Sequence, residues 1–147
     1  KHKDIDFHIY TSPFRISDSF QAMARLAENP LIKRIEYGNS LDTEERCVEW
    51  HAWFQDPNNE LWQIDMIHIV KGRYDGYFEK MAERITAVLT DETRQAILKL
   101  KYETPDTAKI MGVEYYQAVI QDGVRTYAEL EDWKKQHPVT GVIEWIP

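Results

Sequence analysis

Apolar and polar side chains alternate in residues 4–11, the first strongly patterned segment of the chain. Successive side chains of a β-strand point to opposite faces, so the alternation predicts a strand with one apolar and one polar face. The polar face would carry Asp4, Asp6, His8 and Tyr10. This strand therefore presents side chains that are capable of chemistry.

The two segments after this strand predict a helix and a second strand. Residues 17–29 place apolar side chains at helical spacing and end at an Asn-Pro pair, which is typical of a helix stop. Residues 31–37 predict an edge strand, and the Gly-Asn-Ser sequence at 38–40 predicts the turn that follows it.

Residues 46–55 and 60–70 are two strand-like runs, and they carry the clearest hairpin signal in the chain. The intervening residues 56–59 read Asp-Pro-Asn-Asn. Proline presets φ in such a turn and asparagine tolerates the left-handed conformation. We therefore predict an antiparallel hairpin lying beside the strand at residues 4–11.

From about residue 73 onward the apolar spacing changes to three or four residues, which indicates helices. Start signals divide this region. Thr90 is a candidate N-cap, and Thr104 with Pro105 predicts a further start, because proline fits the first helical position. The Thr-Tyr-Ala-Glu run from Thr126 is a capping box for a last helix.

These elements predict an α+β fold. A small mixed sheet with flanking helices would occupy residues 1–72, and a helical region packed on it would occupy residues 73–147. A chain of 147 residues with 43% hydrophobic residues is long enough to bury a core.

Charge and cysteine content narrow the expected partners and setting. The net charge of −7 argues against a broad basic surface for duplex nucleic acid. The single Cys47 excludes an intramolecular disulfide and favours a reducing, cytoplasmic setting. No apolar run reaches the ~18 residues of a membrane span. We therefore expect a cytoplasmic protein that does not bind membranes.

Three aspartates form a candidate metal site. Asp4 and Asp6 are two residues apart on one strand and so share a face, and a third carboxylate from a neighbouring strand would complete an oxygen-rich site suited to Mg²⁺. The third candidate is Asp65, set in the apolar run of residues 62–69. An unpaired buried carboxylate costs several kcal/mol, so Asp65 requires a metal ion, an arginine partner or a tryptophan donor.

These runs resemble a known family. The Asp-Ile-Asp-Phe run from Asp4 is followed, about sixty residues later, by an Ile-Asp-Met run centred on Asp65. Together they resemble the metal-binding pattern of the nucleotidyltransferase superfamily. The resemblance implies two Mg²⁺ ions, or Mn²⁺ in their place, held by Asp4, Asp6 and Asp65. We further expect Asp65 to act as the catalytic base. The resemblance also implies transfer of a nucleoside monophosphate from an NTP to a small-molecule or protein acceptor.

The family also places a Gly-Ser or Gly-Gly turn about ten residues before the first aspartate, where backbone N–H groups hold phosphate. Here only three residues precede Asp4, and Gly38 lies after the pair. We therefore expect residues 1–72 to lack the N-terminal part of the domain. An upstream turn would favour an active enzyme, and its absence would favour an inactive scaffold or interaction module.

Three further residues are candidates for binding substrate. His8 shares the predicted face of Asp6, and Glu49 and His51 alternate on a hairpin strand whose register against Asp65 the sequence leaves open. Each has an ordinary structural alternative, such as a hydrogen bond at the sheet edge. Cys47 reads as a small buried apolar residue and not as a nucleophile.

A rival interpretation pairs the histidine motifs that begin at His8 and His68, in the manner of two-histidine phosphoesterases. It fits poorly, because Thr11 is three residues from His8 and would face the other way on a strand.

Overall fold

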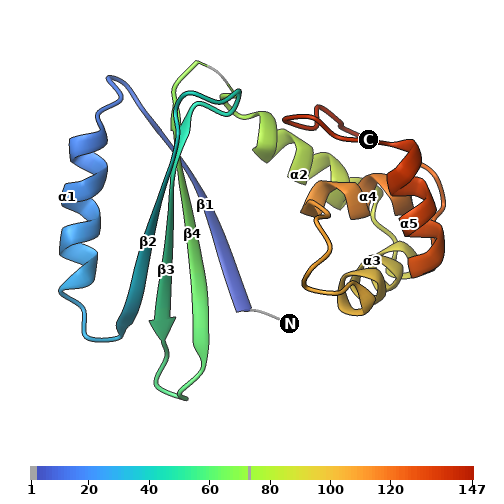
Figure 1. Cartoon of the computed structure of the whole chain (residues 1–147), viewed down its shortest axis with the longest axis horizontal. Coiled ribbons are helices and arrows are strands. Elements are labelled where there is room, and N and C mark those ends of the chain that lie inside the picture. Colours follow the sequence, from blue (N-terminus) through green and yellow to red (C-terminus); the bar gives the residue numbers. More distant parts are fainter. Residues whose placement is uncertain (1–2, 73) are drawn as a thin grey trace. The chain divides into compact units, whose positions relative to one another are not determined.

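The computed structural model describes residues 3–72 and 74–147, whose elements are labelled in Figure 1. Residues up to Asp75 form one compact unit and residues from Gly76 onward a second. The fold is α+β, with a four-stranded mixed sheet followed by a helical region, as predicted. That the helical region packs on the sheet stays a prediction.

The described strands of the first unit form one sheet. Its strands are β1 (Lys3–Thr11), β2 (Ile32–Ser40), β3 (Cys47–Gln55) and β4 (Leu61–Val70). Their order is β1-β4-β3-β2. β1 runs parallel to β4, whereas β3 is antiparallel to both of its neighbours. The predicted hairpin beside the first strand is confirmed.

The β3–β4 turn holds its shape through its own side chains. The Asp56 carboxylate accepts the N–H groups of Asn58 at 2.8 Å and Glu60 at 2.9 Å. Asn59 adopts a φ of 64°, the left-handed conformation that asparagine tolerates. These contacts fix the length of the turn and therefore the register of the two strands.

A buried chain of hydrogen bonds fastens α1 (Ile16–Ala27) to the sheet. The indole of Trp50 donates to the Ser19 hydroxyl at 3.0 Å, and Ser19 lies 3.1 Å from Nδ1 of His68. On the other side of the same ring, Nε2 lies 2.7 Å from the Thr11 hydroxyl. Side chains of β1, β3, β4 and α1 thus meet on one side of the sheet, which we call the helix face.

The turn predicted at residues 38–40 is wrong. Those residues belong to β2 and pair with residues 47–49 of β3, and the connection follows at residues 41–46. Arg46 closes it with a φ of 49°. A strand partner satisfies the backbone of the Gly-Asn-Ser sequence, and this outweighs its local preference for a turn.

The helix start predicted at Thr104 is also wrong. The Thr104 hydroxyl donates to the carbonyl of Leu100 at 2.7 Å and so closes α3 (Asp91–Glu103) instead of opening the next helix. Residues 105–111 are not helical, and α4 spans Gly112–Ile120.

The other two start signals are confirmed. Thr90 and Thr126 each accept the backbone N–H three residues further on, at 3.2 and 3.3 Å. They open α3 and α5 (Tyr127–Gln136), and α2 (Tyr77–Val88) precedes them. Within the described residues, no helix combines the length and apolar character that crossing a membrane requires.

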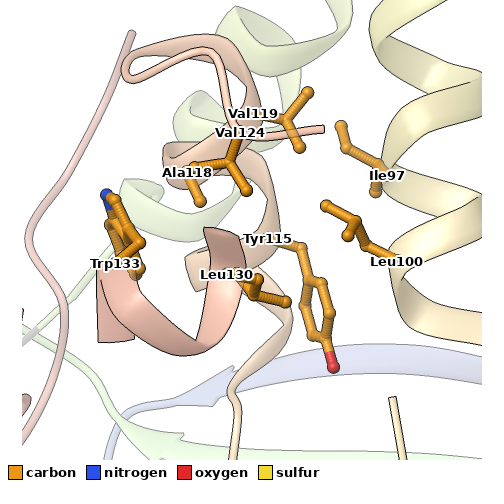
Figure 2. Close-up of a cluster of buried hydrophobic side chains, with 8 residues drawn as sticks. All are labelled: Ile97, Leu100, Tyr115, Ala118, Val119, Val124, Leu130 and Trp133. Atoms are coloured by element: carbon orange, nitrogen blue, oxygen red, sulfur yellow. The ribbon is translucent and has the colours of Figure 1, made fainter. Parts of the chain in front are cut away.

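The helical unit has its own hydrophobic core, drawn in Figure 2. Its buried side chains come from α3, α4, α5 and the α4–α5 connection: Ile97, Leu100, Tyr115, Ala118, Val119, Val124, Leu130 and Trp133. Glu114 is fully buried at the start of α4, where it accepts the Met111 N–H at 2.7 Å and pairs with Lys134. The buried carboxylate is therefore hydrogen-bonded and charge-paired.

The hydrogen bonds around His68 predict that the folded protein is less stable in acid. Burial lowers the pKa of the His68 imidazole below its ordinary 6.5, and the nearby Asp18 opposes this only in part. A lowered folded-state pKa means that protonation favours the unfolded chain. The contribution of the neutral His68 imidazole to the unfolding free energy is therefore complete above pH 6.5 and is lost as the pH falls below that value. We expect the unfolding free energy in urea to fall between pH 7.5 and 5.5, and to fall less in His68→Gln. An equal fall in both proteins would contradict this role.

Candidate functional site

The side of the sheet opposite α1, here called the polar face, carries a row of ionisable groups that crosses all four strands. Asp6 of β1 pairs in register with Asp65 of β4. Asp65 pairs with His51 of β3, and His51 pairs with Glu36 of β2. Paired residues on neighbouring strands point to the same face, and the strands lie about 4.8 Å apart. The fold thus brings Asp6, Asp65 and His51 to one level of the sheet.

Asp65 is held by two donors from its own face. Nδ1 of His51 lies 2.6 Å from Oδ1, and Nε2 of Gln63 donates to Oδ1 at 2.9 Å and to Oδ2 at 3.2 Å. An ionised carboxylate only accepts, so Nδ1 carries the proton. With 16% of its side chain exposed, Asp65 is therefore stabilised by histidine and glutamine, in place of the arginine or tryptophan considered above.

His51 connects Asp65 to a second carboxylate. Its Nε2 lies 3.9 Å from Oε2 of Glu49, and Glu49 accepts from the Ser40 hydroxyl at 2.7 Å. Of the predicted substrate-binding residues, His51 therefore contacts Asp65 directly and Glu49 reaches it through His51.

Asp4 and His8 share the polar face with Asp6 but lie at other levels of the sheet. Asp4 pairs in register with Gln63, and His8 pairs with Ile67. His8 also meets Tyr10 edge to face, with ring centroids 6.5 Å apart. A cation at this position would have to draw the Asp4 and Asp6 carboxylates toward Asp65.

Asp4, Asp6 and Asp65 are ligands of the type that a hard divalent cation prefers, although among the described residues their oxygens are not gathered within 4.8 Å of one another. Mg²⁺ and Mn²⁺ prefer carboxylate oxygens, and Asp4, Asp6 and Asp65 offer these from one face. Oδ1 of Asp65 has two donors and Oδ2 has one longer contact, which leaves Oδ2 the better oxygen for an ion. Outer-shell hydrogen bonds of this kind orient ligating carboxylates in metal proteins.

A second cluster was not foreseen from the sequence. Among the residues that the structure describes, the trio with ligand atoms within 4.8 Å of one another is Glu45, Cys47 and Glu49. Burial, followed by the charges of Glu49 and Glu45, raises the pKa of the Cys47 thiol to about 12. A neutral thiol is a poor metal ligand, so this trio is less suited to a hard cation. The prediction that Cys47 is buried is confirmed, and that it is not a nucleophile stays a prediction.

Strand alternation in the sequence indicates several further residues of the two clusters. Gln63 precedes Asp65 by two residues on the same strand, which places both on one face. Glu45, Cys47 and Glu49 alternate in the same way. Ser40 could not be found locally, because its contact with Glu49 depends on the β2–β3 register.

The paired-histidine interpretation is wrong. His68 pairs with Ile9 and lies on the helix face in contact with Thr11, whereas His8 lies on the polar face. The two rings therefore cannot act on one phosphate.

Comparison with protein-family models, with curated proteins and with solved structures finds no match to this chain. The resemblance to nucleotidyltransferases thus stays a prediction from the residues and their arrangement.

The burial and the raised pKa of Cys47 predict that its thiol reacts slowly. At pH 8, a pKa of about 12 instead of 9.0 lowers the thiolate fraction roughly a thousandfold. We expect a thiol-specific disulfide reagent to label Cys47 of the native protein slowly, at a rate limited by opening of the sheet. In urea, where the chain is unfolded, the same reagent should label Cys47 at once. Labelling of the native protein as fast as of the unfolded chain would contradict this environment.

Proposed function

We propose that the polar face binds Mg²⁺ or Mn²⁺ through Asp4, Asp6 and Asp65, and that the protein transfers a nucleoside monophosphate from an NTP to a small-molecule or protein acceptor. The observation that supports the proposal is the parallel β1–β4 register, which sets Asp6 beside Asp65 on one face. Paired carboxylates on adjacent strands are a natural arrangement for phosphate-bound cations.

Each residue has a distinct role in this proposal. A bound ion would supply charge for the phosphates and activate the attacking oxygen. Asp4 and Asp6 would bind the ion. Asp65 would bind it through Oδ2 and accept the proton of the acceptor hydroxyl. His51 would be a positioning residue, because its Nδ1 lies 2.6 Å from Oδ1 of Asp65 and would orient that carboxylate.

The negative charge of the protein makes nucleotide binding depend on the ion. With a net charge of −7 and carboxylates on this face, the protein alone repels a triphosphate. An ion reverses the local sign, since it is the largest charge in such a site. The proposal therefore requires that NTP binds in Mg²⁺ and not in a chelator.

Metal binding should stabilise the fold. Mn²⁺ at ten times its dissociation constant adds about 1.4 kcal/mol to the unfolding free energy. We expect a rise in melting temperature that Asp6→Asn and Asp65→Asn largely abolish. Asp42→Asn, the same change at an exposed loop position between β2 and β3, should keep the full rise.

Two further variants locate the ion. Glu45→Gln and Cys47→Ala alter the competing trio, and neither should reduce the Mn²⁺ effect. Loss of the effect in these variants with retention in Asp6→Asn would overturn the transferase proposal. Metal binding without Mg²⁺-dependent NTP binding would instead favour the inactive scaffold.

His51→Gln tests the positioning role. Loss of an outer-shell partner typically weakens metal binding by about 10–100-fold. We therefore expect weaker Mn²⁺ affinity, measured by calorimetry, with a smaller change in the metal-free melting temperature. Ser40→Ala, which removes a donor from Glu49 and not from Asp65, serves as the control. Unchanged affinity in His51→Gln would refute the role.

A further inference from the structure

The outer strand β1 leaves its apolar side exposed. Ile5, Phe7 and Ile9 point to the helix face yet are 43%, 50% and 38% exposed. The aromatic contacts of α1 are made further across the sheet, where Phe20 packs on Tyr37 of β2 with ring centroids 4.9 Å apart. Figure 1 shows α1 running beside β2. Within the sheet unit, α1 therefore leaves the β1 side of the helix face uncovered.

The two edges of the sheet differ in how they are protected. β2 has a register irregularity between Ile32 and Arg34 and carries Lys33, Arg34 and Glu36. Bulges and charges of this kind discourage strand addition. β1 pairs regularly with β4 along its length, contains no proline, and carries its charges within residues 4–10, Asp4 and Asp6, on the polar face alone. β1 is thus the edge suited to templating another strand.

We propose that β1 pairs antiparallel with β1 of a second copy of this chain, about a two-fold axis through Phe7. The axis runs perpendicular to the sheet, so both copies keep their helix faces on one side. The product is a continuous eight-stranded sheet. A two-fold contact of this type closes on itself and does not propagate into fibres.

The sequence of β1 is self-complementary in this register. On the helix face, Phe7 meets the partner's Phe7, and Ile5 meets the partner's Ile9. On the polar face, Asp6 meets the partner's His8. Aromatic and β-branched pairs stabilise neighbouring strands, and like charges directly opposite each other destabilise them. An axis moved to Asp6 would set two carboxylates opposite each other, so Phe7 is the favoured centre.

This inference goes beyond the proposed metal chemistry and does not rest on it. It does place the partner's His8 beside Asp6 on the polar face of the joined sheet. One strand edge with a short apolar stripe is smaller than a standard interface of about 1,600 Å². We therefore expect a reversible dimer that forms with rising micromolar concentration.

Sedimentation velocity over a hundredfold range of concentration provides the first test. The parent should shift from monomer to dimer, and Phe7→Lys, which sets two like charges at the axis, should stay monomeric. Leu98→Lys makes the same change at a 61% exposed leucine of the helical unit and should dimerise like the parent. Circular dichroism confirms that each variant is folded. A monomeric parent, or an unaffected Phe7→Lys variant, overturns the proposal.

Cysteine cross-linking tests the register. In a Cys47→Ala background, Phe7→Cys lies opposite itself and should form a disulfide-linked dimer under mild oxidation. Ile5→Cys alone and Ile9→Cys alone should not, whereas an equal mixture of the two should cross-link as a heterodimer. Equal cross-linking at all three positions, or none at Phe7→Cys while the parent dimerises, overturns the two-fold pairing about Phe7.

Discussion

The position of β4 between β1 and β3 is the constraint on which the rest of the structure depends. Parallel pairing on one side and antiparallel pairing on the other place Asp6, Asp65 and His51 at one level of the sheet. A shift of one residue in either pairing would send Asp65 or its neighbours to the opposite face. The candidate site is therefore a consequence of register.

The helix face holds that register in place. His68 lies three residues after Asp65 on β4 and on the opposite face of the sheet, and its ring joins Thr11 of β1 to Ser19 of α1. Buried polar groups with all of their partners present specify one arrangement, since any slip leaves them unpaired. The hydrogen bonds on the helix face thus hold the register that places Asp6, Asp65 and His51 together on the polar face.

Local patterns predicted the strands, the hairpin and two of the helix starts, because alternation, turn residues and capping act over a few positions. The site depended on longer-range information. The contact of His51 with Asp65 required the length of the turn at residues 56–59. The errors at residues 38–40 and at Thr104 share one cause, which is a hydrogen-bond partner outside the local sequence pattern. Residues 38–40 pair with β3 instead of forming a turn. The Thr104 hydroxyl bonds to the preceding helix instead of capping the next one.

Paramagnetic broadening by Mn²⁺ tests the central claim most directly. Amide spectra of the protein titrated with sub-stoichiometric Mn²⁺ report distance from the ion at every residue. The metal site proposed here predicts the strongest broadening around Asp6 and Asp65 and less at residues 45–47, which lie toward the start of β3. Broadening centred on residues 45–49, or spread without a centre, would contradict a metal site at the β1–β4 pair.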